Sequence, residues 1–258
     1  MDINLNADLG ESFGAWRMGD DRALLAVVGS ANIACGFHAG DPLGMVQTVQ
    51  MARDAGVSLG AHPSFPDLQG FGRRVMQLSA RELEAVVVYQ IGALIGVALS
   101  QGSRVTHVKP HGAMNNLACE DAAMAATLAG AVKSVDAELI LLAPALSELA
   151  SAGRAAGLRV ADEVFADRAY TEQGNLVPRS APGAVLHHSA ECLAHVLRML
   201  RQGGIVSQSG KLLPCQFHSI CVHGDSAHAV ATATAVREGL KAAGVHLKTL
   251  PELGLKPG

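Results

Sequence analysis

Six short polar clusters follow apolar, strand-like runs along this chain of 258 residues. Each cluster begins where an apolar run ends, and together they contain carboxylates, imidazoles and cationic side chains. Such groups can move protons, bind a metal ion or hold an anionic substrate. The clusters are Asp8 and Glu11; His38 and Asp41; His62; Lys109 and His111; Glu163, Asp167 and Arg168; and His223 and Asp225.

The first cluster offers two carboxylates, Asp8 and Glu11, separated by three positions. Neighbouring carboxylates can hold a metal ion, orient water or act as a general base. Alternatively, both side chains only cap turns around Gly10 and Ser12. The pattern leaves both interpretations open.

His38 lies in a glycine-containing segment that ends in Asp41 and Pro42. Glycines on both sides of the histidine allow the backbone to approach a ligand closely, so we interpret His38 as functional. Asp41 is either a ligand-binding residue or the N-cap of a helix that begins at Pro42. We do not expect Cys35, in the same segment, to be a nucleophile.

Cationic side chains in two segments suit an anionic ligand. Arg73 and Arg74 are adjacent in the glycine-rich loop after His62, and paired guanidinium groups suit phosphate or carboxylate. A solvated loop charge is the alternative. Lys109 follows the run Val105–Val108, where an ammonium group can bind phosphate or stabilise an oxyanion.

Histidines and acids complete the candidate set. His111 is a stronger site candidate than His107, which we expect to line or pack in the interior of the fold. Glu163 and Arg168 can supply a base and an anion clamp, whereas Asp167 beside Arg168 can equally form a surface ion pair.

The last cluster, His223 and Asp225, repeats the order of histidine, glycine and aspartate seen at His38, and Asp225 can also cap the final helix. If a metal ion is bound, the candidate ligands are Asp8, His62 and His111.

The composition excludes several classes of protein. Hydrophobic residues make up 49% and charged residues 17%, which predicts a large core rather than disorder. Aromatic residues make up only 3%, the net charge is −3, and no basic run exceeds Arg73–Arg74, so we expect no nucleic-acid binding. Apolar stretches such as Val86–Leu99 are too short and interrupted to predict a membrane span.

The cysteines and the amino terminus indicate the compartment. The five cysteines include no Cys-x-x-Cys pair, and no signal-peptide pattern is visible at Met1–Asn4. We therefore expect a cytoplasmic protein with reduced thiols.

Several common motifs are missing from the sequence. It has no phosphate-binding loop of the form Gly-x-x-x-x-Gly-Lys-Ser/Thr, no Gly-x-Gly-x-x-Gly after its first apolar run, and no Gly-x-Ser-x-Gly elbow. It also lacks His-Glu-x-x-His and cysteine-rich zinc spacing. Any nucleotide must therefore be bound by other means.

The elements that position these clusters alternate regularly between strand and helix. A capping box at Ser79–Glu82 predicts a helix to about Leu99, Pro144 is expected to open another helix, and the long loop Phe165–Pro182 can act as a lid. The expected strands are Ile3–Ala7, Ala31–Cys35, Val57–Ala61, Val105–Val108, Leu139–Leu142, Leu158–Asp162 and Phe217–Val222.

This alternation indicates a parallel sheet with helices outside it. The carboxyl ends of parallel strands open on one side, so the polar clusters are predicted to converge on one pocket. Because the clusters recur after strands along the whole chain, we favour a closed barrel over an open sheet. We expect one domain over residues 1–258.

The motifs around these clusters resemble the LamB/YcsF family. The matching segments run nearly end to end, and Asn32–Asp41 is quite specific. They are Asn4–Ser12, Ser30–Asp41, Gly60–Arg74, Val108–Gly112, Asp162–Tyr170 and Val222–Asp225. One departure is Asn115, where relatives usually carry tyrosine, so a role for an aromatic hydroxyl at this position is in doubt.

The resemblance implies a seven-stranded β/α barrel of the glycoside hydrolase/deacetylase type. It also implies the A subunit of an ATP-hydrolysing 5-oxoprolinase, which converts 5-oxo-L-proline, ATP and water to L-glutamate, ADP and phosphate together with subunits B and C. Mg²⁺ is expected with the ATP. The alternatives are a stand-alone metal-dependent deacetylase or amidohydrolase, and a substrate-binding subunit whose partners catalyse the reaction.

Overall fold

Seven parallel strands close into a barrel in the computed structural model, which describes residues 1–224 and 228–258. Each strand pairs with the next, and the last returns to pair with the first, where Asn4 lies opposite Ser219. The barrel strands are β1 (Asp2–Leu9), β2 (Ser30–Ala34), β3 (Ser58–His62), β4 (Val105–Val108), β5 (Ile140–Pro144), β6 (Arg159–Phe165) and β9 (Ser219–Val222). The predicted seven-stranded β/α barrel is therefore confirmed.

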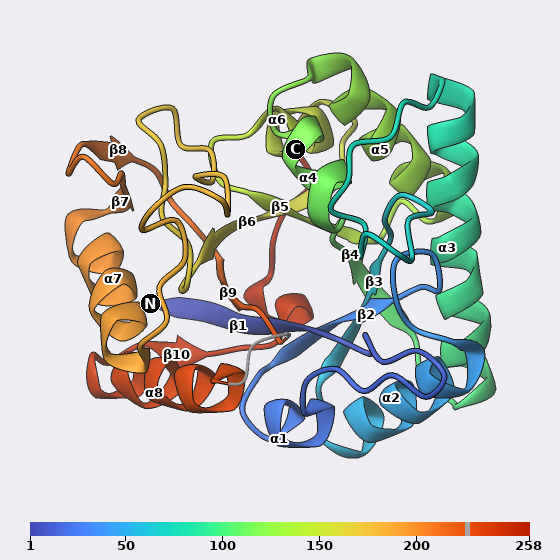
Figure 1. Ribbon diagram of the computed structural model, residues 1–258, viewed down its shortest axis with the longest axis horizontal. Coiled ribbons are helices and arrows are strands. Elements are labelled where there is room, and N and C mark those ends of the chain that lie inside the picture. Colours follow the sequence, from blue (N-terminus) through green and yellow to red (C-terminus); the bar gives the residue numbers. More distant parts are fainter. Residues whose placement is uncertain (225–227) are drawn as a thin grey trace.

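Helices surround the barrel as an outer layer (Figure 1). Two of them begin at caps that the sequence predicts: Ser79 and Glu82 form the capping box, and Asp41 caps the helix that begins at Pro42. The helices are α1 (Asp21–Leu25), α2 (Pro42–Asp54), α3 (Ala80–Ser100), α4 (Gly112–Ala118), α5 (Ala122–Val135), α6 (Glu148–Ala155), α7 (Ser189–Gln202) and α8 (Ala229–Ala242), with a short 3₁₀ helix, η1 (Leu250–Leu253).

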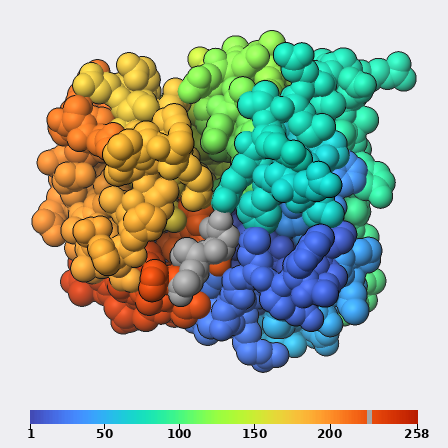
Figure 2. All heavy atoms as spheres, viewed as in Figure 1, coloured from blue at the N-terminus to red at the C-terminus, as the bar shows by residue number. Residues whose placement is uncertain are grey.

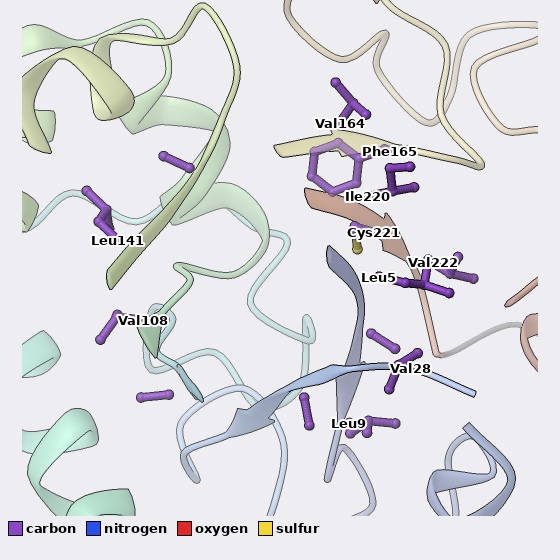
Figure 3. Close-up of a cluster of buried hydrophobic side chains, with 14 of the residues drawn as sticks. Leu5, Leu9, Val28, Val108, Leu141, Val164, Phe165, Ile220, Cys221 and Val222 are labelled. Atoms are coloured by element: carbon purple, nitrogen blue, oxygen red, sulfur yellow. The ribbon is translucent and has the colours of Figure 1, made fainter. Parts of the chain in front are cut away.

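Apolar and polar residues alternate along the strands, so that an apolar layer lies outside the barrel and polar side chains fill its interior. In β1, Leu5 and Leu9 belong to the large hydrophobic cluster beneath the helices, together with Val108 of β4 and Leu141 of β5 (Figure 3). Successive strand residues point to opposite faces, so the polar residues between them face the barrel axis. β1 therefore contributes to the apolar layer with one face and to the pocket with the other.

The barrel interior is filled by a hydrogen-bonded polar network. The amide of Asn4 donates to Ser30 at 2.8 Å, Ser219 donates to Asn4 at 2.8 Å, and Asn32 donates to Asn6 at 2.7 Å. Such pairing compensates for the loss of hydration of these buried groups. The network gives the polar residues at the strand ends a fixed base.

His107 lies in this interior, as expected, and its Nε2 is 3.1 Å from the Asn32 amide oxygen. Its ring packs against Gly60, where an added Cβ would stand 2.1 Å from Nε2. Only glycine fits at position 60, because any side chain would displace the imidazole. Burial lowers the pKa of His107 to about 3, so the ring is neutral at physiological pH.

Several elements differ from the sequence-based expectations. Pro144 does not open a helix; it ends β5, and α6 begins after the N-cap Ser147. Helix α4 was not anticipated, because its seven residues give little periodicity. Also unanticipated are the antiparallel pair β7 (Gly204–Val206) and β8 (Leu212–Pro214), and β10 (His246–Leu247), which pairs in parallel with the start of β1.

Helix α3 is the one helix of the described chain that is long and apolar enough to cross a membrane. The helix runs for 21 residues and so is longer than the apolar stretch Val86–Leu99 considered from the sequence. Core helices of globular proteins can be equally long and apolar. One face of α3, with Val87 and Ile91 buried, packs on the barrel core.

The cysteines are all described and all free. Burial raises the pKa of the Cys35 thiol to about 12, which keeps it protonated. This agrees with the expectation that Cys35 is not a nucleophile, because the thiolate is the reactive form.

Candidate active site

A pocket of about 450 Å³ opens where the barrel strands end. Its lining includes Asp8, His62, Lys109, His111 and His223, which come from four of the predicted clusters and from four different strand ends. The loop after β3 and the loop after β6 face each other across the middle of the face shown in Figure 2. The clusters therefore converge as predicted.

Lys109 occupies the centre of the pocket floor and is buried, with 3% exposure. Its ammonium group donates to Asp8 Oδ1 at 2.9 Å and to Cys221 Sγ at 3.0 Å. Glu163 Oε2 is 3.3 Å away without hydrogen-bond geometry, so this contact is electrostatic. One cation thus lies between two carboxylates. We call Asp8, Lys109, Glu163, Asp167 and His223 the charged side of the pocket.

The charges on this side stabilise one another. Burial opposes ionisation of Asp8, but His62 and Lys109 outweigh it and hold the pKa of Asp8 well below its usual value. Burial alone would lower the pKa of Lys109, but the acidic groups around it, Asp8 first among them, raise that pKa well above its usual value. An ion pair is therefore the stable state of Asp8 and Lys109.

Glu163 behaves differently from Asp8. Burial raises the pKa of Glu163, and the nearby Lys109 offsets this only in part. Its Oε1 accepts a hydrogen bond from Asn6 at 2.8 Å. A carboxyl group whose pKa lies nearer neutrality can give or take a proton during a reaction, so Glu163 fits the expected role of a base.

Asn6, Asn32 and Cys221 are contacts of the site that the sequence reasoning did not select. Asn32 donates to Asp8 at 2.9 Å and Asn6 donates to Glu163. A signal was present in β1, where Asn4, Asn6 and Asp8 alternate with apolar residues. A strand with one polar face inside a barrel predicts side chains that support the site.

A second group of side chains, which we call the imidazole side, consists of Glu11, His38, His62 and His111. All four are buried, and one nitrogen or oxygen from each lies within 4.8 Å of the others. His38 stacks on His111 with 4.0 Å between ring centroids, and His62 meets His111 edge to face at 4.8 Å. Four predicted clusters are thus brought together at the ends of β1, β2, β3 and β4.

Backbone carbonyls fix the tautomers of two rings. His62 Nδ1 is 2.6 Å from the Lys109 carbonyl, and His111 Nε2 is 2.9 Å from the Phe71 carbonyl. A carbonyl only accepts, so each of these nitrogens carries a hydrogen. In the neutral ring of His111, Nδ1 is then an acceptor, whereas His62 Nε2 lies 3.4 Å from Asp8 Oδ2.

Burial lowers the pKa of His38 well below its usual value, and the neighbouring His62 lowers it further. The pKa of His111 is lowered well below its usual value in the same way, by burial and by His38. Imidazoles that remain neutral keep lone pairs available for a proton or a cation.

The loop after β3 covers the imidazole side. Gly72 has φ of +64°, and an added Cβ would stand 2.2 Å from Ser64 Oγ and 2.9 Å from His38 Cβ. Phe71 also has a positive φ, 55°, although it is not glycine, and this conformation directs its carbonyl to His111. Local backbone strain of this kind is common at functional sites.

The two predicted arginines of this loop, Arg73 and Arg74, have different surroundings. Arg73 lines the pocket and lies over the Phe71 ring, 4.9 Å from its centroid. Arg74 instead pairs with Asp67, and its side chain is 62% exposed. Phosphate binding by Arg74 stays a prediction, whereas the position of Arg73 suits it directly.

The loop after β6 completes the charged side. Asp167 accepts from His223 Nδ1 through both carboxylate oxygens, at 2.8 and 2.9 Å, so it does not form the idle surface pair with Arg168 that the sequence left open. The ring of His223 is thereby oriented and stacks on Phe165. A carboxylate that holds an imidazole in one tautomer is a common arrangement for acid–base chemistry.

Arg168 lines the pocket and also holds the loop in place. It donates to the carbonyls of Val177 at 2.7 Å and Ala184 at 3.3 Å. Burial lowers its pKa to about 10, so it remains a cation at neutral pH. Arg179 also lines the pocket and was not selected from the sequence.

One predicted residue, Asp41, lies outside this pocket. Asp41 caps α2, accepting from the Gly44 amide at 2.9 Å and the Gly14 amide at 2.8 Å, and it borders a separate hollow with Asp21. The capping interpretation is therefore confirmed, and ligand binding by Asp41 stays a prediction. Asp225 lies outside the described residues.

The donor atoms around the pocket do not suit a Mg²⁺ ion held by this chain. Mg²⁺ prefers an octahedron of oxygen ligands. Asp8 and Glu163 already neutralise Lys109, and the imidazole side is rich in nitrogen. Three cationic side chains, Lys109, Arg73 and Arg168, line the same pocket.

Comparison with known proteins extends these observations. The LamB/YcsF family matches residues 3–254. The chain is 64% identical to the 5-oxoprolinase A subunit of Azoarcus sp. (strain BH72), over 98% of this chain and 99% of that protein. The crystal structure of a lactam utilization protein from Thermus thermophilus matches with a TM-score of 0.90 and 43% identity, covering 97% of this chain and 100% of that one.

A more distant structural match supports the fold alone. The catalytic domain of a peptidoglycan N-acetylglucosamine deacetylase from Eubacterium rectale ATCC 33656 superposes with a TM-score of 0.52 at 10% identity, covering 96% of this chain and 88% of that one. The deacetylase-like barrel expected from the sequence is thus confirmed as an architecture.

Proposed function

This chain belongs to the LamB/YcsF family, and from that premise we propose that it is the A subunit of an ATP-dependent 5-oxoprolinase. The enzyme hydrolyses the lactam C–N bond of 5-oxo-L-proline to give L-glutamate, with ATP cleaved to ADP and phosphate. The observation that carries the proposal is the 64% identity, over nearly the whole of both chains, to a protein named as the A subunit of 5-oxoprolinase. The free thiols suit a cytoplasmic enzyme.

The charged side of the pocket supports chemistry of this kind. A lactam carbonyl is a poor electrophile, and phosphorylation of its oxygen converts that oxygen into a leaving group. Lys109 and Arg73 would meet the phosphate, and Arg168 the substrate carboxylate, because guanidinium and ammonium groups stabilise these anions. Asp8 would hold Lys109 in place, and either Asp8 or Glu11 would orient water.

Proton transfer falls to the imidazoles and to Glu163. His223, oriented by Asp167, lines the pocket with its ring, and His62 and His111 line the opposite part of the floor. These residues would move protons to the ring nitrogen and from water as the C–N bond breaks. Mg²⁺ would arrive with ATP and neutralise part of its phosphate charge.

The partners in this proposal are subunits B and C, 5-oxoproline and ATP. The test measures ATP-dependent glutamate release from 5-oxoproline by this chain alone and with candidate partner subunits. We expect release with the partners present. If no glutamate is released under either condition, the assignment fails.

A second function, a stand-alone metal-dependent deacetylase or amidohydrolase, is favoured by the imidazole side, where His62 and His111 lie close together. For that function, hydrolysis would need no ATP and would stop after treatment with a chelator. A third outcome, substrate binding without turnover until partners are added, would identify a binding subunit.

A further inference from the structure

We propose that Glu11, His38, His62 and His111 form a binding site for one divalent first-row transition-metal ion, of the Zn²⁺ or Co²⁺ type. The four residues are buried, and one donor atom from each lies within 4.8 Å of the others. Three imidazoles and one carboxylate are a donor set that such ions prefer. The site differs from the ligands Asp8, His62 and His111 considered from the sequence, because Asp8 is paired with Lys109.

The first observation behind the proposal is a close contact between ring nitrogens of His62 and His111. His62 Nε2 and His111 Nδ1 are 3.0 Å apart, and the carbonyls of Lys109 and Phe71 hold the hydrogens on the opposite nitrogens of the two rings. His111 Nδ1 therefore presents a lone pair toward His62 Nε2. A metal ion at about 2.1 Å from each nitrogen places adjacent ligands about 3.0–3.4 Å apart, which matches this contact.

The second observation is the lack of a partner for His38. Its ring is 1% exposed, and both nitrogens find no hydrogen-bond partner among the described residues. A buried polar atom without a partner costs free energy, and its persistence calls for an explanation. Its Nε2 lies 3.8 Å from Glu11 Oε1, beside the other donors.

The surroundings provide the support that metal ligands need. Metal-bound histidines commonly donate their other N–H to a backbone carbonyl, which orients the ring and raises its basicity. His62 and His111 already make these bonds. Glu11 Oε1 is 3.9 Å from His111 Nδ1, so binding would draw the carboxylate in by roughly half an ångström.

Metal content provides a test that needs neither ATP nor substrate, so its failure is distinct from failure of the 5-oxoprolinase assay. The full-length chain is stripped with a chelator and titrated with Zn²⁺ and with Co²⁺. We expect one ion per chain by elemental analysis, a visible Co²⁺ absorption band and a higher melting temperature with Zn²⁺.

Two variants locate the ion. His38→Gln removes one ligand and should lower the affinity at least about 10²-fold, because even the supporting partners of ligands are worth 10–100-fold. His223→Gln is the matched control, since His223 belongs to a second group of close donor atoms, with Asp8 and Cys221, which is the alternative place for an ion. It should keep the ion.

A measurement on the unmodified chain covers the case in which a variant fails to fold. With ¹⁵N-labelled histidine, Zn²⁺ should shift the imidazole resonances of three residues, His38, His62 and His111. The proposal is overturned if no ion binds, if His223→Gln rather than His38→Gln loses it, or if both variants keep it as an adventitious ion.

Discussion

The charged side and the imidazole side of the pocket differ in how their buried polar groups are paired. On the charged side, the cation of Lys109 lies between Asp8 and Glu163, and Asp167 holds His223 through two contacts. On the imidazole side, His38 has no hydrogen-bond partner among the described residues, and His62 Nε2 and His111 Nδ1 lie 3.0 Å apart.

The difference indicates what each side needs in order to function. Buried charges are stable when they compensate one another, so the charged side is complete before substrate arrives. Neutral imidazoles whose lone pairs have no hydrogen-bond partner still lack a group that compensates for their burial. The first side is therefore preorganised for an anion, and the second for a cation or a proton.

The largest expected effect follows removal of the central cation. Lys109→Ala leaves Asp8 and Glu163 buried without a counter-charge, which should destabilise the fold by about 3–5 kcal/mol. Loss of a placed electrostatic donor should also lower turnover about 10²–10³-fold in the full assembly. Denaturant unfolding and the glutamate assay measure the two effects.

The control is Lys241→Ala, which removes an exposed lysine paired with Glu238 on α8 at 3.1 Å. A surface pair of this kind contributes little, so both measurements should stay near those of the unchanged chain. Near-normal turnover by Lys109→Ala would contradict the role assigned to the charged side.

A smaller effect distinguishes the adjacent arginines. Arg73→Ala should raise the KM for ATP roughly tenfold or more, because a charge-assisted hydrogen bond contributes about 1.5–3 kcal/mol. Arg74→Ala is the matched control, since Arg74 pairs with Asp67 outside the described pocket lining. Steady-state kinetics at varied ATP measures both, and equal effects would show that the loop rearranges when nucleotide binds.

The smallest expected effect concerns pH. Burial lowers the pKa of His107 to about 3 in the folded chain, against an ordinary value of 6.5. Between these values the unfolded chain binds a proton that the folded chain does not, so stability falls as pH falls. His107→Gln removes the group that takes up this proton in the unfolded chain. The free energy of unfolding should then fall less steeply with falling pH, by up to about 1.4 kcal/mol per pH unit.

The pKa of His38 is also lowered, so His38→Gln should make the same slope shallower below pH 6.5. Denaturant unfolding at a series of pH values gives the slopes. An unchanged slope in both variants would show that these imidazoles gain their protons in the folded state too.

Much of the site could be predicted from the sequence, because parallel strands bring their carboxyl ends together. The positions of Asp8, His62, Lys109 and His111 follow from short apolar runs that end at these side chains, without knowledge of the barrel's radius. The capping box at Ser79 was likewise readable, since it depends on residues only three positions apart.

Other features depended on contacts across the barrel. Adjacent arginines have the same local sequence signal, and only the fold of the loop after β3 turns Arg73 toward the pocket and Arg74 toward Asp67. The pairing of Asp167 with His223 joins residues 56 positions apart. The local sequence allows Pro144 either to open a helix or to end a strand. It ends a strand because it pairs with Glu163 of β6.

The sequence by itself determined the alternation of elements, the residue types at each strand end and the family. The tertiary structure decided which imidazoles share one cluster, which carboxylates share Lys109, and which polar groups are left without a partner among the described residues. The physical reason is that periodicity and capping are local, whereas hydrogen bonding, burial and the pKa shifts they cause depend on neighbours that only the closed barrel supplies.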